Sequence, residues 1–248
     1  MKRLLDLFGR RRAAPVPFDA PLAPAEPLAV IGDVHGRDDL LARLLDRLGR
    51  EAPDHRVILV GDYLDRGEGS AAVLRRLPAR PDLVCLKGNH EAMCLGFLED
   101  PPREGRRWLA NGGLQTLASF GVGGLTPTSG PEPLYEARDR LAVAMGEELI
   151  GWVQARPLHW ASGNVAVTHA GADPALPMEE QDRRALLWGH PRFAETPRVD
   201  GLWIVHGHTI VPEPLAEAGR VAIDTGAYAT GRLTAALIGP GELRFLST

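Results

Sequence analysis

Short apolar runs alternate with leucine patterns of helical spacing over the first hundred residues of the chain. The runs at 28–32 (LAVIG), 57–61 (VILVG) and 82–88 (DLVCLKG) are rich in aliphatic residues and predict strands. Leucine recurs at three- and four-residue spacing over 38–48, and 68–77 shows a similar pattern, so both segments predict helices. This β-α-β-α-β order is typical of an α/β fold with parallel strands.

Each predicted strand runs directly into a charged loop. The three loops read GDVHG at 32–36, GDYLDRG at 61–67 and GNHE at 88–91. The 24 and 20 residues between them (37–60 and 68–87) each fit one helix and one strand. Because parallel strands end at one common edge of a sheet, we expect the three loops to lie side by side there.

The side chains of these loops suit a divalent metal. Asp33, His35, Asp62 and Asn89 would bring hard oxygens together with an imidazole nitrogen, a donor set that suits Mn, Fe, Zn or Co. Without a cation, the carboxylates would repel each other in a partly buried site. The glycines that precede them would let the backbone turn sharply and approach the ions.

Composition adds limits on partners and location. The chain has 248 residues with 44% hydrophobic and 24% charged residues, which fits one globular domain with a tail. Its formal net charge of −4 gives no reason to expect a nucleic-acid partner. No run approaches the roughly 20 apolar residues that a membrane span needs, so we expect a soluble chain. Cys85 and Cys94 lack metal-type spacing, which favours core thiols and a cytoplasmic location.

The N-terminal segment 1–27 predicts a basic, Pro- and Ala-rich tail ahead of a domain over 28–248. Its first part, MKRLLDLFGRRR, places apolar residues at helical spacing among five basic ones, too short a run for a signal peptide. A frayed tail is the simpler interpretation, and a basic arm that touches an anionic membrane surface or a partner is the alternative. The following Pro/Ala stretch predicts an extended linker.

The three loop motifs resemble the signature of the phosphoprotein phosphatase family of metallophosphoesterases, which includes bacterial Ser/Thr phosphatases and symmetrical diadenosine tetraphosphatases. Two later pieces also match: VTHAGAD, which contains His169, and HGHT, which contains His208. The segment WLANGGLQTLASFG (108–121) looks like bacterial relatives as well. The resemblance spans about 28–230 and implies a β-sandwich of mixed sheets flanked by helices, with a dimetal site at the strand ends.

The resemblance also implies two metal sites that share one carboxylate. Their ligands would be Asp33, His35, Asp62, Asn89, His169 and His208. Asp62 would bridge two divalent ions, for which manganese is expected and Fe, Zn or Co are alternatives. Two such ions about 3.5 to 4 Å apart can clamp a phosphoryl oxygen and lower the pKa of a bridging water to about 7, so that a metal-activated hydroxide is the nucleophile.

Three further residues would act on the substrate by the same resemblance. His90 would protonate the leaving alkoxide, and Asp65 would orient its imidazole. Arg66 would bind the remaining phosphate oxygens through its planar fork. Metallophosphodiesterases often share the metal ligands but lack this Asp-Arg pair, so the pair favours the phosphatase branch.

Two assignments stay open at this point. His206 lies two residues before His208 and is its rival as a ligand; His208 is preferred because relatives place the ligand directly before Thr or Gln. In LLWGHPRF, His190 stands where bacterial relatives have an arginine that completes the phosphate clamp, and Arg192 follows two residues later. Either residue could complete the clamp, or half of it is missing; Arg192 is preferred because its charge is independent of pH.

The substrate is less defined than the reaction, because residues 92–168 carry no readable motif. We expect dimetal-dependent hydrolysis of phosphate monoesters, first as a Ser/Thr phosphoprotein phosphatase. A symmetrical dinucleoside polyphosphate hydrolase is the alternative, so the partner would be a phosphoprotein or a phosphorylated small molecule. A non-catalytic binding module on the same fold is a third hypothesis. The complete set of His90, Asp65 and Arg66 argues against that third hypothesis.

Overall fold

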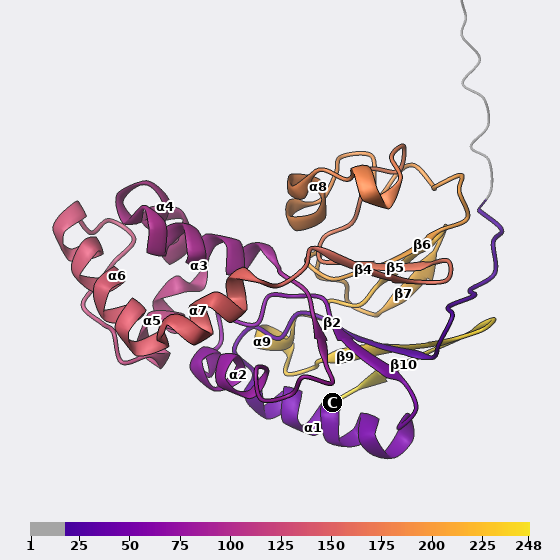
Figure 1. Ribbon diagram of the computed structural model, residues 1–248, viewed down its shortest axis with the longest axis horizontal. Helices are drawn as coiled ribbons and strands as arrows, with labels where there is room; N and C mark the ends of the chain where they lie inside the picture. The colour runs from indigo at the N-terminus through magenta and orange to yellow at the C-terminus, as the bar shows by residue number, and fades with distance from the viewer. Residues whose placement is uncertain (1–17) are drawn as a thin grey trace, which may run out of the picture.

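The chain folds into two five-stranded sheets, and their central strands are buried (Figure 1). A computed structural model describes residues 18–248. Sheet A has the order β10 (Glu242–Ser247), β9 (Thr234–Gly239), β1 (Leu28–Ile31), β2 (Arg56–Leu59), β3 (Val84–Cys85). Strands β1, β2 and β3 are parallel and β9 runs antiparallel to β1, so this sheet is mixed.

Sheet B is built from the second half of the chain. Its order is β4 (His159–Ser162), β5 (Val165–Thr168), β6 (Trp203–His206), β8 (Arg220–Ala222), β7 (Leu215–Glu217). The inner strands β5, β6 and β8 are parallel, and β4 and β7 pair antiparallel at the edges. The carboxyl ends of β5 and β6 lead into the segments that contain His169 and His208.

An apolar layer joins the two sheets face to face. Val30 and Ile58 of sheet A pack in one cluster with Val167, Val205 and Val221 of sheet B, and all five side chains are fully buried. Burial of an aliphatic side chain of this size stabilises a fold by roughly 1.5 to 3 kcal/mol. This layer therefore fixes the relative position of the strand ends that carry the candidate site.

Helices lie around the two sheets (Figure 1). They are α1 (Asp38–Glu51), α2 (Ser70–Arg76), α3 (Asn89–Glu99), α4 (Pro101–Trp108), the kinked segment η1 (Leu109–Gly113), α5 (Leu114–Ser119), α6 (Pro131–Met145), α7 (Glu147–Gln154), η2 (Met178–Glu180), α8 (Arg183–Trp188) and α9 (Ala227–Thr230). Helix α1 buries its leucine face against sheet A, which explains the leucine spacing of 38–48.

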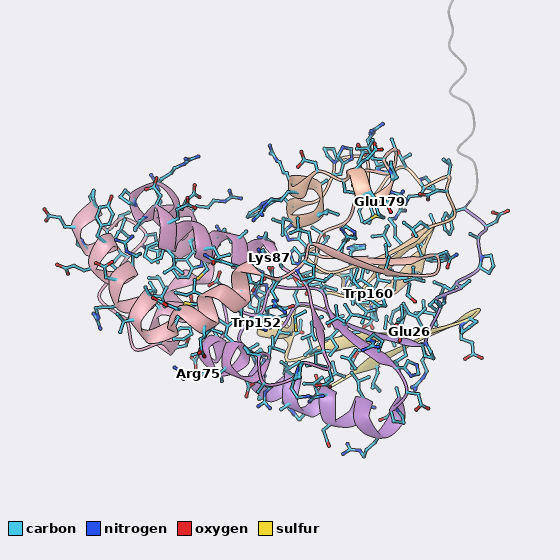
Figure 2. All side chains as sticks on the ribbon, viewed as in Figure 1. Glu26, Arg75, Lys87, Trp152, Trp160 and Glu179 are labelled. Atoms are coloured by element: carbon cyan, nitrogen blue, oxygen red, sulfur yellow. The ribbon has the colours of Figure 1, made fainter. Side chains whose placement is uncertain are left out.

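Helices α3 to α7 form a lobe beside the two sheets, and its apolar side chains share one core cluster with sheet A (Figure 1). Lys87 and Trp152 lie where this lobe meets sheet A (Figure 2). The Lys87 ammonium donates to the carbonyl of Gln154 at 2.7 Å, and the ring of Trp152 lies 6.1 Å from that of Tyr63. These contacts hold the helical lobe close to the strand ends.

Residues 18–27 pack against sheet B, although the Pro/Ala pattern predicted an extended linker ahead of Leu28. Phe18 stacks edge-on against Trp203 at 5.1 Å, and the Trp203 indole N–H donates to the carbonyl of Ala20. The Asn164 amide donates to Pro21 O and accepts from Ala23 N–H. Ordered packing therefore begins before residue 28, while the predicted basic arm falls within residues 1–17, outside the described part.

The predicted strands and helices of the first hundred residues are present, although some of them are shorter than predicted. The run 82–88 contributes only the two-residue strand β3, because its later residues turn into the GNHE loop. The β-sandwich of mixed sheets flanked by helices is confirmed. Within residues 18–248, no helix is long and apolar enough to cross a membrane.

Candidate active site

The three charged loops meet at the ends of β1, β2 and β3, as their spacing predicts. The backbone N–H of His35 donates to the carbonyl of Asp62 at 2.8 Å, which joins the first loop to the second. The backbone N–H of His90 donates to Asp62 Oδ1 at 3.0 Å, which joins the third loop to the second. Asp62 thus lies at the centre of the three loops.

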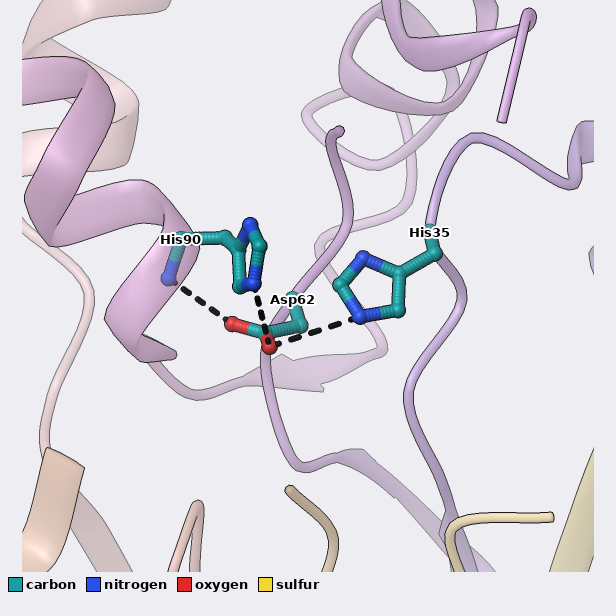
Figure 3. A group of neighbouring side chains, drawn as sticks. All are labelled: His35, Asp62 and His90. Carbon is teal, nitrogen blue, oxygen red and sulfur yellow. Dashed lines mark hydrogen bonds and ion pairs between the residues drawn. The ribbon is translucent and has the colours of Figure 1, made fainter. Parts of the chain in front are cut away.

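Four imidazoles and the Asp62 carboxylate form two overlapping clusters. His35, Asp62 and His90 make one group, and Asp62, His169 and His208 make the other, with the ligand atoms of each group within 4.8 Å of one another. Figure 3 shows the first group around Asp62 Oδ2. This oxygen lies 3.6 Å from His35 Nε2, 3.8 Å from His90 Nε2 and 3.4 Å from His169 Nε2.

The tautomers of two imidazoles leave lone pairs directed at the centre of the site. The carbonyl of Leu64 accepts from Nδ1–H of His35 at 2.9 Å, and the carbonyl of Val60 faces Nδ1 of His169 at 3.2 Å. Their Nε2 atoms are then unprotonated, as in metal-bound histidine. His169 Nε2 also faces Asn89 Oδ1 at 2.7 Å. Two acceptors this close fit a cation that both of them bind.

Burial and charge at the site also fit cations. Burial raises the pKa of Asp33 and of Asp62 well above the usual range, and the charges of Asp224 and Asp62 raise that of Asp33 further. Burial likewise lowers the pKa of His35 and of His169, so both imidazoles are neutral. Carboxylates and neutral imidazoles are the protein groups that bind divalent transition metals.

Asp33 reaches the site from the end of β1. Its two carboxylate oxygens accept from the backbone N–H of His208, at 3.1 and 3.0 Å. The same carboxylate faces Gly207, where an added Cβ would lie 1.9 Å from Oδ1. This contact ties sheet A to the loop after β6 in sheet B. Asp33 is outside both compact ligand groups, so its role as a ligand stays a prediction.

Backbone strain concentrates at the same residues. Five of the six non-glycine residues with positive φ in residues 18–248 are His35 (45°), Asp62 (51°), Asp65 (70°), Arg66 (68°) and His208 (65°). The left-handed region costs a non-glycine residue about 1–3 kcal/mol. Such conformations persist only where the surrounding structure enforces them, and they cluster at functional sites. Here the strained residues are the ones that the sequence predicts as metal ligands or as groups that act on the substrate.

His90 and Asp65 form a hydrogen-bonded pair held by the helical lobe. His90 Nδ1–H donates to Asp65 Oδ2 at 2.7 Å. Trp108 Nε1–H donates to both Asp65 oxygens, at 3.1 and 3.0 Å, and the Thr116 hydroxyl donates to Oδ1 at 2.6 Å. Burial raises the pKa of Asp65, and these two donors oppose the increase. Burial, with Arg66 next, lowers the pKa of His90 to about 3.

Arg66 lies next to Nε2 of His90, the ring nitrogen that does not bind Asp65. A guanidinium nitrogen is 3.3 Å from His90 Nε2, and the guanidinium carbon lies 4.9 Å from the centre of the Tyr228 ring. Tyr228 also packs edge-on against His35 at 5.4 Å. A cation–π contact of this kind restricts where the guanidinium can point. Arg66 is therefore placed beside the candidate proton donor.

Several residues of the site carry no signal that the sequence alone reveals. Glu91 is fully buried, and its carboxylate accepts from the backbone N–H groups of Asp62, Tyr63 and Gly88, each at 2.8 Å. The GNHE motif contains Glu91, but spacing gives no hint that it holds the loop of Asp62. Tyr228 and Asp224 approach from the segment after β8, about 130 residues beyond the charged loops.

Both candidates for the second half of the phosphate clamp lie beside Asp173. A guanidinium nitrogen of Arg192 is 3.1 Å from Asp173 Oδ1, and His190 Nε2 is 3.6 Å from Oδ2. Over residues 18–248, neither side chain hydrogen-bonds or ion-pairs with Arg66. The choice between Arg192 and His190 stays a prediction.

His206, the rival of His208, packs elsewhere. Its ring meets Phe193 edge-on at 5.0 Å, and its Nδ1 faces the carbonyl of Gly207 at 3.0 Å. Burial lowers its pKa to about 4. His208, by contrast, lies 5.1 Å from the ring of His169 and belongs to a compact ligand group.

Comparisons with known proteins agree with this geometry. Residues 26–212 match the family of calcineurin-like phosphoesterases. The serine/threonine-protein phosphatase 2 of Salmonella typhimurium is 27% identical over 217 residues, which cover 83% of this chain and 89% of that protein. A symmetrical bis(5'-nucleosyl)-tetraphosphatase of an Acidovorax species is 31% identical over 158 residues, 62% of this chain and 47% of that protein. This chain therefore spans about half the length of that relative.

A solved structure supports the fold independently. The crystal structure of a putative diadenosine tetraphosphatase superposes with a TM-score of 0.62 at 18% identity, over 92% of this chain and 98% of that one. This likeness concerns the arrangement of the two sheets and their helices. Since the family match covers most of the chain and includes all three charged loops, the chain belongs to the calcineurin-like phosphoesterases and is a metallophosphoesterase-type hydrolase.

Proposed function

We propose that this chain is a Ser/Thr phosphoprotein phosphatase that hydrolyses phosphate monoesters with two divalent ions. The observation that carries the proposal is the placement of His90. Its Nδ1–H is bound to Asp65 at 2.7 Å, while Nε2 faces both Arg66 at 3.3 Å and the central Asp62 oxygen at 3.8 Å. A proton donor, a phosphate-binding cation and a metal ligand therefore meet at one point.

The proposed ligands divide into two sets that share Asp62. One set is completed by Asp33 and His35, and the other by Asn89, His169 and His208. When bound, a pair of divalent ions polarises the phosphoryl group and lowers the pKa of water to about 7. Manganese is our first expectation, with Fe, Zn and Co as alternatives that the same oxygen and nitrogen donors accept.

The other residues act on the phosphoryl group and the leaving oxygen. Arg66 donates to His90 Nε2 in the free protein, so we propose that it turns to the phosphate when substrate binds and frees this nitrogen. A dianionic phosphate beside the imidazole favours its protonated form. His90 then donates the Nε2 proton to the departing serine or threonine oxygen, while Asp65 holds the ring in place.

The choice of a protein substrate rests on the relatives. The Salmonella relative named serine/threonine-protein phosphatase 2 is matched over nearly its whole length. The tetraphosphatase relative has higher identity over a shorter stretch, and this supports dinucleoside polyphosphates as the second candidate. We further propose a cytoplasmic location, because Cys85 and Cys94 are buried free thiols.

One comparison of substrates tests the proposal. Phosphate release is measured from p-nitrophenyl phosphate, a phosphoserine peptide and diadenosine tetraphosphate, each with and without manganese. We expect manganese-dependent release from the first two. Fast hydrolysis of diadenosine tetraphosphate alone would instead support the second candidate, and the absence of metal dependence would contradict both.

A further inference from the structure

A basic cavity of about 430 Å³ lies between α8 and the helical lobe, next to the candidate active site. Figure 1 shows α8 facing α3 and α4 from the side of sheet B. The cavity is lined by Ala92, Arg107, Asp182, Arg183, Arg184, Leu187 and Trp188. Arg183 and Leu187, like Arg184 and Trp188, are four residues apart, so each pair lies on one face of α8.

Three arginines and the single carboxylate of Asp182 line this cavity. Arg107, Arg183 and Arg184 form no ion pair in the described part of the chain, in which most other arginines pair with Asp or Glu. The carboxylate of Asp182 lines the cavity but accepts from the backbone N–H of Arg184 at the start of the helix. Three arginines around one cavity, in a chain of net charge −4, indicate a site for anionic groups.

Trp188 connects this cavity to the candidate active site. The Arg107 guanidinium lies 4.0 Å from the centre of its ring, and the ring of His208 meets Trp188 edge-on at 6.3 Å. Ala92, on the other wall, belongs to the first turn of α3, the helix that begins at the GNHE loop; the contact of Trp188 with His208 is what places the cavity beside the site. A substrate whose phosphate reaches His90 can therefore place neighbouring groups in the cavity.

A second cavity continues the first along α3. It has a volume of about 700 Å³, shares Ala92 and Trp188 with the first, and extends past Gly96 to Tyr135. Its lining also carries Glu99, Asp100 and Glu104, so the site for acidic groups is confined to the first cavity. Together the two cavities form a groove that is longer than one phosphate group needs. Arginines lie over the rings of both Trp188 and Tyr135, at 4.0 and 5.5 Å, so one face of each ring is not free to stack on a nucleobase. These features favour an extended peptide over a nucleotide.

We infer that this basic cavity binds acidic side chains next to the phosphorylated residue of a protein substrate. The inference rests on the proposed phosphoprotein phosphatase function and adds a sequence preference to it. Arginine binds carboxylates through paired N–H donors. Exposed charge pairs of this kind mainly raise the association rate and the discrimination between substrates. Acidic phosphopeptides should therefore be better substrates than neutral ones.

Two phosphoserine peptides of equal length test this inference. One carries Asp and Glu around the phosphoserine, and the other carries Ala and Gln. We expect the wild-type enzyme to favour the acidic peptide by about tenfold in kcat/KM at low salt, with a smaller preference at high salt because salt screens exposed charges. Equal kcat/KM for the two peptides would overturn the inference.

Substitutions of the cavity arginines test whether the preference for the acidic peptide arises in the cavity. The double change Arg183→Ala with Arg184→Ala should reduce the preference to about twofold or less, since two of the three arginines are removed. Arg107→Gln, on a different helix, is a second variant in case the first fails to fold. The matched control is Arg43→Ala with Arg50→Ala, which removes two exposed arginines of α1 and should keep the full preference. Each rate is divided by the same variant's rate on p-nitrophenyl phosphate.

The remaining outcomes separate this inference from the proposed function. If both peptides are hydrolysed and the preference survives in the cavity variants, the inference fails and the phosphatase proposal stands. If neither peptide is hydrolysed while p-nitrophenyl phosphate is, both fail. If the cavity variants selectively lose hydrolysis of diadenosine tetraphosphate, the cavity binds a nucleotide polyphosphate instead, and the inference is overturned.

Discussion

The hydroxyl of Thr116 donates to Asp65 Oδ1 at 2.6 Å and accepts from the backbone N–H of Asp65 at 2.9 Å. Thr116 belongs to α5 of the helical lobe, whereas Asp65 lies in the loop after β2. The lobe therefore supports the carboxylate that accepts a hydrogen bond from His90. The segment 108–121, which the sequence marks only as similar to bacterial relatives, supplies this contact and the indole donor of Trp108.

Thr116→Val should weaken proton donation by His90. Valine has the same shape but leaves Asp65 Oδ1 with only the longer bond from Trp108, and a hydrogen bond to a charged group contributes about 1.5–3 kcal/mol. We expect hydrolysis of a phosphoserine peptide to fall about tenfold more than that of p-nitrophenyl phosphate, whose leaving group needs no proton. Thr116→Ser is the control and should restore the rate; a purely structural role predicts equal losses on both substrates.

His90→Asn should show the same leaving-group dependence in a stronger form. General-acid catalysis typically contributes about 10² to 10⁴-fold, and this contribution is lost only where the leaving oxygen must be protonated. Phosphoserine hydrolysis should therefore fall far more than p-nitrophenyl phosphate hydrolysis. Steady-state kinetics on both substrates make the comparison. A similar decrease on both would show that His90 has another role, such as metal binding through its place beside Asp62 Oδ2.

Asp62→Asn should weaken both metal sites at once. Its Oδ2 lies within 3.8 Å of three imidazole nitrogens, so both ligand sets depend on this oxygen. We expect elemental analysis to find two divalent ions per wild-type chain and a loss of both in the variant. Manganese should also raise the melting temperature of metal-free wild-type protein, because a ligand that binds only the folded state stabilises it. A single ion in a fully active sample would contradict the shared-ligand assignment.

Gly207→Ala should disrupt the site although it replaces none of the proposed metal ligands or catalytic side chains. A Cβ at this position would lie 1.9 Å from Asp33 Oδ1, so the carboxylate must move. Asp33 is a proposed ligand and also holds the backbone of His208, so its displacement should cost at least about 10- to 100-fold in metal affinity or activity. Gly49→Ala is the control: it lies in α1 with no atom within 4 Å of the added Cβ, and it should stabilise the fold by up to about 1 kcal/mol. Normal activity in Gly207→Ala would show that Asp33 has room to adjust.

The sequence predicts the first half of the site better than the second, for a physical reason. Asp33, Asp62 and Asn89 follow consecutive parallel strands, and such strands must end at one edge. His169 and His208 come from sheet B, and only the packing of the two sheets brings them to Asp62. No local pattern encodes that packing, so these two positions depended on family resemblance.

The supporting contacts are harder still to predict. Thr116 and Trp108 approach Asp65 across more than 40 residues, through a kink at Asn111 and Gly112. Gly112 has a φ of 110° there, and its carbonyl accepts from the backbone N–H of Arg66. Periodicity describes helices but not such a kink, and the Pro/Ala pattern likewise gave no sign that residues 18–27 pack against sheet B.

The last prediction concerns the phosphate clamp, for which the sequence favours Arg192 and the structure places both Arg192 and His190 beside Asp173. As a clamp residue Arg192 would bind the transferring phosphate, so Arg192→Ala would raise KM and lower kcat together. In the structure its side chain is 55% exposed and paired with Asp173, which His190 also faces. An exposed ion pair contributes about 0–1 kcal/mol. A pair this weak lets the guanidinium leave Asp173 for the phosphate, so we expect Arg192→Ala to raise KM and lower kcat together, with His190→Ala milder.

The measurement is kcat and KM for Arg192→Ala and His190→Ala on p-nitrophenyl phosphate at pH 6 and pH 8. A loss in His190→Ala confined to pH 6 would identify the imidazolium as the second half of the clamp, because only a protonated imidazole carries positive charge. A joint defect in kcat and KM for Arg192→Ala at both pH values would show that the guanidinium leaves Asp173 for the phosphate. Asp173→Asn separates these cases, since it releases Arg192 from its partner and would then lower KM only if Arg192 binds the substrate.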